Sequence, residues 1–95
     1  MRHNRIVNID HIFEITDGTL KDLQMVNPNQ VGQVKNENGK VISSITPIIM
    51  VFNQNRGDKN ERIEILRNNG GDFDKIINYY GKDRTIKEII NYENI

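Results

Sequence analysis

The sequence predicts a single α+β domain over residues 1–95, in which an antiparallel sheet of four to five strands is followed by two short C-terminal helices. Three observations predict this architecture. The longest apolar run, Gly39–Phe52, is rich in β-branched residues, which favour strands. It begins with the second residue of an Asn-Gly pair, which is typical of a hairpin turn because both residues tolerate positive φ. From Asp72 onward the apolar residues recur at helical spacing.

The N-terminal third is predicted to form strands and turns. Arg5–Ile9 is expected to be a strand, and Asp10–Thr16 fits either a helix or a second strand. We expect the strand because β-branched residues dominate, with Asp17-Gly18 as a hairpin turn into Thr19–Val26. The helix is the alternative. Asn27-Pro28-Asn29 is a turn.

The central segment is predicted to be a hairpin that leads into a buried strand. Gln30–Lys35 can pair with Lys40–Ile45. Pro47 lacks a backbone N–H, so the ladder must break, bulge or reach an edge there. Ile48–Phe52 is apolar on both faces, which predicts a strand buried on both sides or covered by self-association. The run is too short to span a membrane.

The next two segments are predicted to be a loop and a last strand. Asn53–Asn60 is polar throughout and is expected to be an exposed loop. Glu61–Arg67 could be a strand that places Ile63 and Ile65 on one face, with a short helix as the alternative.

The two C-terminal helices are predicted from spacing and capping. Asp72–Tyr80 is expected to be helical, because its large apolar residues follow the i, i+3, i+4, i+7 pattern of a helix face. Ile86–Tyr92 is expected to be the second helix, since Thr85 and Glu88 form a T-x-x-E capping box. The predicted apolar stripe of the first helix consists of Phe73, Ile76, Ile77 and Tyr80.

A short stretch resembles a known fold. Val31–Val34, the Asn38-Gly39 turn and Lys40–Ile42 are similar to the strand–turn–strand of SH3-like small barrels, over about a dozen residues. This resemblance implies an alternative fold, a small β-barrel with a helical tail.

Composition excludes several classes of protein. Thirteen Lys and Arg balance thirteen Asp and Glu, so a strongly basic nucleic-acid footprint is missing. Cysteine is absent, which excludes disulfides and cysteine-ligated metals. We find no signal peptide and expect a cytoplasmic protein. Sixteen isoleucines and fourteen asparagines, with no alanine, indicate AT-rich coding, as in a low-GC bacterium, its phages or its mobile elements.

No motif predicts chemistry. His3 and His11 lack supporting ligands and do not predict a metal site. Ser43-Ser44 falls within a predicted strand and is not a nucleophile elbow. Asn68–Gly71 precedes a predicted helix but lacks the Lys-Ser/Thr of a phosphate-binding loop. The prediction is therefore no catalytic, cofactor-binding or metal-binding residue.

By exclusion we expect a non-catalytic protein-interaction module, such as a small regulator or inhibitor from a phage or mobile element. The exposed loop is expected to supply the partner-binding residues Asn55, Arg56, Asp58 and Lys59. The apolar run is expected to join two copies in a homodimer, because an unguarded apolar edge strand requires a cover. The residues expected to self-associate are Ile48, Met50 and Phe52.

Two alternatives from other classes remain open. The first is a nucleic-acid-binding accessory protein, in which aromatic and basic side chains form a stacking and phosphate surface. Its candidate residues are Tyr79, Tyr80, Tyr92, Lys82, Arg84 and Lys87. The second is a small-ligand binder with its pocket at a subunit interface, which an apolar, asparagine-lined cavity between subunits would favour.

Overall fold

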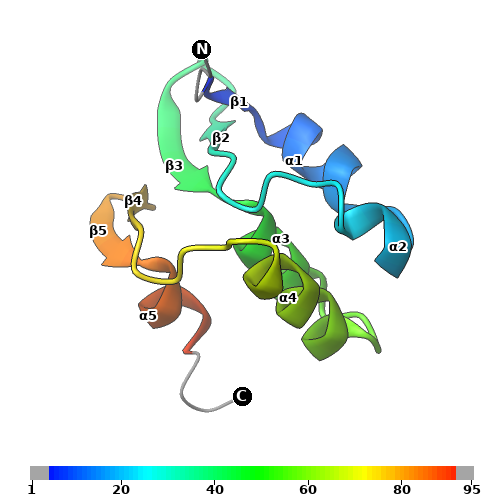
Figure 1. The fold of residues 1–95 in the computed structure, drawn as a ribbon. Helices are drawn as coiled ribbons and strands as arrows, with labels where there is room; N and C mark the ends of the chain where they lie inside the picture. Colours follow the sequence, from blue (N-terminus) through cyan, green and yellow to red (C-terminus); the bar gives the residue numbers. More distant parts are fainter. Residues whose placement is uncertain (1–4, 92–95) are drawn as a thin grey trace.

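The structure, a computed structural model, describes residues 5–91 and is a mixed α+β fold (Figure 1). Within these residues it contains five helices, a three-stranded sheet and a separate two-stranded sheet. The predicted α+β class is confirmed. The strands, however, form two small sheets instead of the one larger sheet or the barrel that the sequence predicted. In chain order the elements are β1 (Val7–Asn8), α1 (Ile9–Thr16), α2 (Leu20–Leu23), β2 (Gly32–Lys35), β3 (Val41–Ile45), α3 (Pro47–Gln54), α4 (Lys59–Asn68), β4 (Ile76–Tyr79), β5 (Lys82–Thr85) and α5 (Ile86–Ile90).

The three-stranded sheet has the order β1-β2-β3 and contains the predicted central hairpin. β2 and β3 are antiparallel, with Gly32 opposite Ile45, whereas β1 runs parallel to β2. Gly39 adopts a φ of 81° in the connecting turn, a conformation that glycine reaches without strain. The turn closes with a 2.9 Å bond from the Asn36 amide to the Lys40 carbonyl.

α1 is a helix, so the strand prediction for Asp10–Thr16 was wrong and the helical alternative is right. Asn8 begins it, because its side-chain oxygen accepts a hydrogen bond from the Asp10 amide at 2.8 Å. Ile12 and Thr16, four residues apart, are both fully buried. The predicted strand Thr19–Val26 was also wrong, since it contains α2, which starts with a Thr19–Asp22 capping box.

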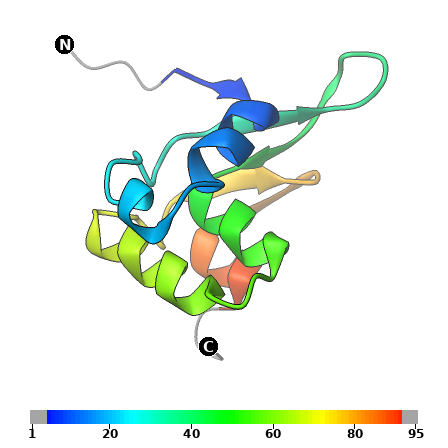
Figure 2. The same cartoon turned by 90° about the vertical axis from the view of Figure 1, so that its right-hand side faces the viewer.

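The predicted strand Ile48–Phe52 was wrong, because these residues belong to the helix α3. Pro47 occupies the first turn, where its missing N–H costs nothing and its fixed φ suits a helix. Asn55 ends the helix in the left-handed conformation, with a φ of 52°. The run is apolar on all sides because α3 lies at the centre of the molecule, packed by α1, α4 and α5 (Figure 2).

α4 follows a short turn and shows that Glu61–Arg67 is helical, as the alternative prediction had it. The predicted loop Asn53–Asn60 is correspondingly shorter, because α3 extends into it from one side and α4 from the other. Ile63 and Leu66 are the residues of α4 that are buried in the core.

The predicted helix Asp72–Tyr80 was wrong, since most of it forms the β4–β5 hairpin. Ile77 is 6% exposed and Ile76 is 65% exposed, which is the alternation of a strand. Tyr80 and Gly81 form the turn with φ values of 49° and 88°, and positive φ at both central positions is what a two-residue hairpin turn of type I′ requires.

α5 is the second predicted helix, and it begins as predicted. The Thr85 hydroxyl accepts from the Glu88 amide at 3.1 Å, and the Glu88 carboxylate accepts from the Thr85 amide at 2.9 Å. Ile86 and Ile90 bury the inner face of the helix. Its predicted last residue, Tyr92, lies outside the described residues.

Candidate functional site

The turn between α3 and α4, together with the first residue of α4, holds the four residues predicted to bind a partner, and all four contact this chain's own side chains. Lys59 Nζ donates to Asn55 Oδ1 at 3.3 Å and lies 4.7 Å from the centre of the Phe52 ring. Arg56 pairs with Asp17 at 3.4 Å. Their role toward a partner stays a prediction, and the structure gives them a role in joining α1, α3 and α4.

Arg62 is the residue of this region that the sequence analysis missed. Its side chain is 3% exposed, its Nε lies 2.9 Å from Asp58 Oδ1, and its Nη1 donates to the Thr16 carbonyl at 3.1 Å. The hydrogen bond from Arg62 lowers the pKa of Asp58 below its ordinary value of 3.8. The i, i+4 spacing of Asp58 and Arg62 is the sequence signal that could have revealed this pair.

The residues predicted to self-associate lie on α3 and not on an edge strand. Ile48 and Met50 are buried in the core, and Phe52 is half-buried. A strand-to-strand dimer through these three residues therefore lacks the exposed strand on which it depended. That the chain forms a homodimer stays a prediction.

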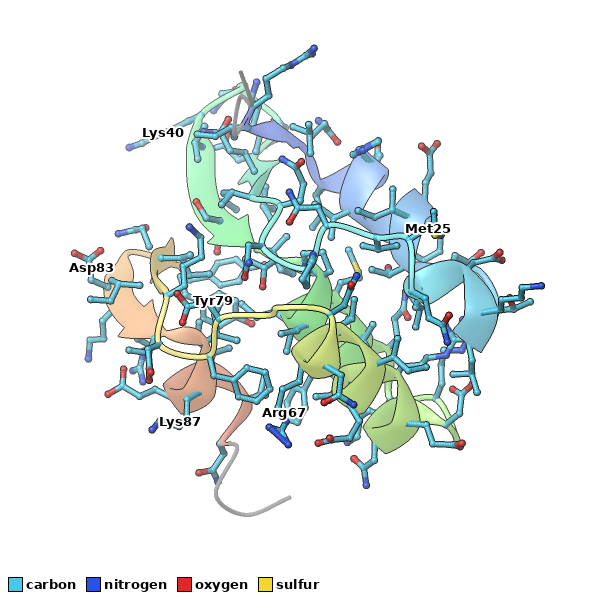
Figure 3. The ribbon with its side chains drawn as sticks, viewed as in Figure 1. Met25, Lys40, Arg67, Tyr79, Asp83 and Lys87 are labelled. Carbon is cyan, nitrogen blue, oxygen red and sulfur yellow. The ribbon has the colours of Figure 1, made fainter. Side chains whose placement is uncertain are left out.

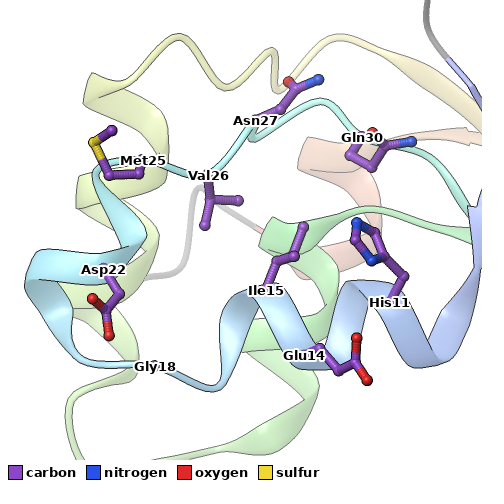
Figure 4. A pocket seen from close by; sticks show the side chains of 9 residues that line it. All are labelled: His11, Glu14, Ile15, Gly18, Asp22, Met25, Val26, Asn27 and Gln30. Atoms are coloured by element: carbon purple, nitrogen blue, oxygen red, sulfur yellow. The ribbon is translucent and has the colours of Figure 1, made fainter.

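A concave surface lies between α1, α2 and the segment that leads into β2. We call it the α1–α2 groove, and it encloses about 420 Å³ (Figure 4). It is lined by His11, Glu14, Ile15, Gly18, Asp22, Met25, Val26, Asn27 and Gln30.

The middle of the groove is apolar and its borders are polar. Ile15 from α1 and Val26 from the segment after α2 face each other across the hollow (Figure 4). Met25 stands at one end and is 88% exposed. His11 and Gln30 lie together at the other end, toward β1. This arrangement offers an apolar contact between groups that form hydrogen bonds.

Two carboxylates, those of Glu14 and Asp22, lie along one border of the groove. Asp22 Oδ2 accepts a 2.9 Å hydrogen bond from the Thr19 amide, and this bond lowers the pKa of Asp22 below its ordinary value. Asp22 is therefore charged at neutral pH. Within residues 5–91 neither carboxylate forms an ion pair, so Glu14 is free to pair with a cation from outside, whereas Asp22 already accepts the capping bond of α2 through Oδ2.

The groove continues into a second hollow along β1. This hollow measures about 580 Å³ and shares His11 and Gln30 with the first. Arg5, Ile6 and Val7 line its far part, and Ile6 is exposed. Through these two shared residues the hollows form one continuous concave surface along α1 and β1.

The aromatic and basic residues near the C-terminus are brought together in part. Tyr79, Tyr80, Lys82 and Arg84 line one hollow beside α5. Lys87 instead pairs with Asp74 at 3.8 Å. Tyr92 is not among the described residues.

In residues 5–91 no three His, Asp or Glu side chains gather in a way that could hold a metal ion. His11 lines the groove, and His3 lies outside these residues. None of the helices between residues 5 and 91 has the length and apolarity needed to cross a membrane.

No protein-family model matches the chain, and no curated protein or solved structure shows a significant match to it. Its function is therefore inferred from the chain's own geometry.

Proposed function

We propose that this chain is a non-catalytic protein-interaction module whose α1–α2 groove docks a segment of a partner protein. The proposal rests on the exposure of Met25, whose side chain is almost fully exposed beside the apolar pair Ile15 and Val26. Contiguous exposed apolar patches rimmed by polar groups mark interaction surfaces, and here Met25 adjoins the half-buried Ile15 and Val26. Methionine is suited to this task because its flexible thioether adapts to different contours.

The charges of the groove specify the chemistry of the partner segment. Glu14 and Asp22 present two carboxylates without a cation, next to the apolar middle of the groove. A segment with an apolar side chain would fit the apolar middle of the groove, and a lysine or arginine beside it would fit the two carboxylates at the border. The segment of the proposed partner is accordingly basic and amphipathic.

The groove is a better candidate than the α3–α4 turn that the sequence analysis favoured. The side chains of that turn already bind one another and α1, so binding a partner through them would first break internal bonds. Within residues 5–91 the side chains of Glu14, Ile15 and Met25 in the groove form no internal hydrogen bond or ion pair, whereas those of Asp22, Asn27 and Gln30 do. A module of this kind would act as a regulator or inhibitor, because it would cover a segment through which its partner binds another molecule.

Site-specific photo-crosslinking tests the proposal. A photoreactive amino acid replaces Met25 in the full chain, cross-linking is performed in native-host extract, and mass spectrometry maps the captured peptide. We expect a protein peptide that contains a lysine or arginine within a few residues of the cross-link.

Two matched variants make the result specific to the groove. Glu14→Lys reverses a charge in the groove and should abolish the cross-link. Glu37→Lys makes the same change in the exposed β2–β3 turn and should leave it intact. A cross-link that survives Glu14→Lys, or one that both variants weaken equally, would contradict docking in the groove.

A further inference from the structure

A third hollow, separate from the α1–α2 groove and from the hollow along β1, lies between the β4–β5 hairpin and α5. We call it the hairpin hollow, and it encloses about 380 Å³. It is lined by Tyr79, Tyr80, Lys82, Arg84, Glu88 and Ile89. Two aromatic rings and two cations therefore share one small surface.

The cations Lys82 and Arg84 lie on one face of the strand β5, and the carboxylate of Asp83 lies on the other. Directly opposite residues of an antiparallel pair point to the same side, and Tyr79 is opposite Lys82 while Ile77 is opposite Arg84. Asp83 lies opposite Asn78 on the other face and binds its side-chain amide at 3.3 Å. Figure 3 shows Asp83 and Tyr79 on opposite sides of the hairpin. A sequence that is neutral on average thus presents its cations to the hollow.

The aromatic part of the hollow is held by the hairpin turn. Tyr80 is 58% exposed, and its ring meets that of Tyr79 edge to face, with centroids 4.9 Å apart. The Tyr80 amide donates to Ser43 Oγ at 3.0 Å, which ties the turn to β3. The exposed ring is therefore available for stacking on a backbone that is fixed in place.

The net charge of the hollow is positive. Within residues 5–91 neither Lys82 nor Arg84 forms an ion pair. The single carboxylate, that of Glu88, accepts a hydrogen bond from the Thr85 amide in the capping box. This bond lowers the pKa of Glu88 below its ordinary value. Two cations thus face one carboxylate that is already engaged in capping a helix.

We propose that the hairpin hollow binds single-stranded nucleic acid, with a base stacked on Tyr80 and flanking phosphates contacted by Lys82 and Arg84. Every base has a π-face, and cations beside a stacking ring are the usual construction of such sites. An acidic peptide would use the cations but leave the exposed ring without a stacking partner. A duplex keeps its bases stacked, so it cannot place one on Tyr80. The proposal does not depend on the groove.

Fluorescence anisotropy with a labelled single-stranded oligothymidylate and the full chain tests this site. With two phosphate contacts, the logarithm of the binding constant should fall against the logarithm of salt concentration with a slope of about −1.4, about −0.7 per contact. A duplex of the same length and a polyglutamate peptide should both bind more weakly. Absent binding of the single strand, or equal or tighter binding of either competitor, would overturn the proposal.

Three variants locate the binding. Tyr80→Asn removes the ring yet suits the positive φ of the turn, because Asn-Gly is a preferred hairpin dipeptide. It should weaken binding about tenfold with an unchanged melting temperature. Lys82→Gln should reduce the steepness of the salt slope by about 0.7, whereas Lys40→Gln, in the β2–β3 turn, should change nothing. Undiminished binding by both Tyr80→Asn and Lys82→Gln would place any nucleic-acid contact elsewhere and refute the assignment.

Discussion

The helix α3 and the β4–β5 hairpin are of similar size, but they are held in the molecule in different ways. Five consecutive residues of α3, Pro47–Val51, are buried, and the helix packs against α1, α4 and α5. In the two strands of the hairpin only Ile77 is buried. The hairpin is held by that buried side chain, by the half-buried Tyr79 that packs on the core, and by two hydrogen bonds. One runs from the Tyr80 amide to Ser43 Oγ and the other from the Ile86 amide to the Lys75 carbonyl.

This difference separates stability from binding. Apolar burial is the largest favourable contribution to folding, so the free energy of unfolding depends mainly on α3 and the elements around it. The hairpin and the α1–α2 groove instead carry the exposed side chains Tyr80 and Met25. Substitutions in the first region should unfold the chain, and those in the second should change binding while leaving the fold intact.

The largest expected effect is at the centre of α3. Ile49 is fully buried, so Ile49→Ala should lower the free energy of unfolding by about 2–5 kcal/mol, through lost burial and the cavity left behind. Urea denaturation monitored by circular dichroism measures this change. A loss below about 1 kcal/mol would mean that α3 is not central to the core.

The next largest expected effect is a difference in the free energy of unfolding between two substitutions in the hairpin. Ile77→Ala should cost about 2 kcal/mol or more, because Ile77 is the one buried residue of the two strands. Ile76→Ala removes the same atoms from an exposed position and should cost less than about 0.5 kcal/mol. The same urea denaturation applied to both variants decides the matter. Equal losses would favour the helix that the i, i+3, i+4 spacing predicted.

A smaller effect is expected from Arg62, which joins α4 to the end of α1. Arg62→Met keeps much of the apolar stem but leaves the Thr16 carbonyl and Asp58 without the guanidinium. The expected loss is about 1–3 kcal/mol. Thermal and urea denaturation should agree on it, and a change within about 0.5 kcal/mol would show that solvent replaces both bonds without penalty.

The smallest expected effect is a pH dependence. The folded-state pKa of Asp58 is lowered below 3.8 by Arg62, so its contribution to stability is fully present above about pH 4 and is lost as pH falls through the folded value. Asp58→Asn should therefore make the free energy of unfolding fall less steeply as the pH is lowered. Part of the fall should remain, because the pKa values of Asp22 and Glu88 are lowered too. An unaltered acid slope in Asp58→Asn would contradict the pairing with Arg62.

Local signals in the sequence predicted some elements correctly. The Asn38-Gly39 turn and the Thr85–Glu88 capping box each depend on short-range backbone geometry, and both are present in the structure. Such features need no knowledge of the rest of the chain.

The errors came from patterns that tertiary packing decides. A run that is apolar on both faces fits a strand covered on two sides or a helix covered all round, and Ile48–Phe52 is the latter. The proline start was the neglected signal, since Pro47 suits the first turn of a helix. Conversely, Ile76 and Ile77 matched a helical period, but the Tyr80-Gly81 turn forces a hairpin.

The candidate site was not predicted, for a related reason. The α1–α2 groove exists only because Ile15 of α1 faces Val26 in the segment after α2, and the sequence predicted strands in place of both helices. The T-x-x-D box of Thr19 and Asp22 was a usable signal for α2. No sequence signal, however, could place Met25 at the end of a groove before the helices were known.

The contrast between the two regions is tested most directly by native-state hydrogen exchange. Amides of α3 and of the facing turns of α4 should exchange only through global unfolding, so their opening free energies should equal that from urea denaturation. Amides of the β4–β5 hairpin should exchange through local opening at a clearly lower free energy. Protection in the hairpin equal to that in α3 would contradict the separation of a buried stabilising centre from exposed binding surfaces.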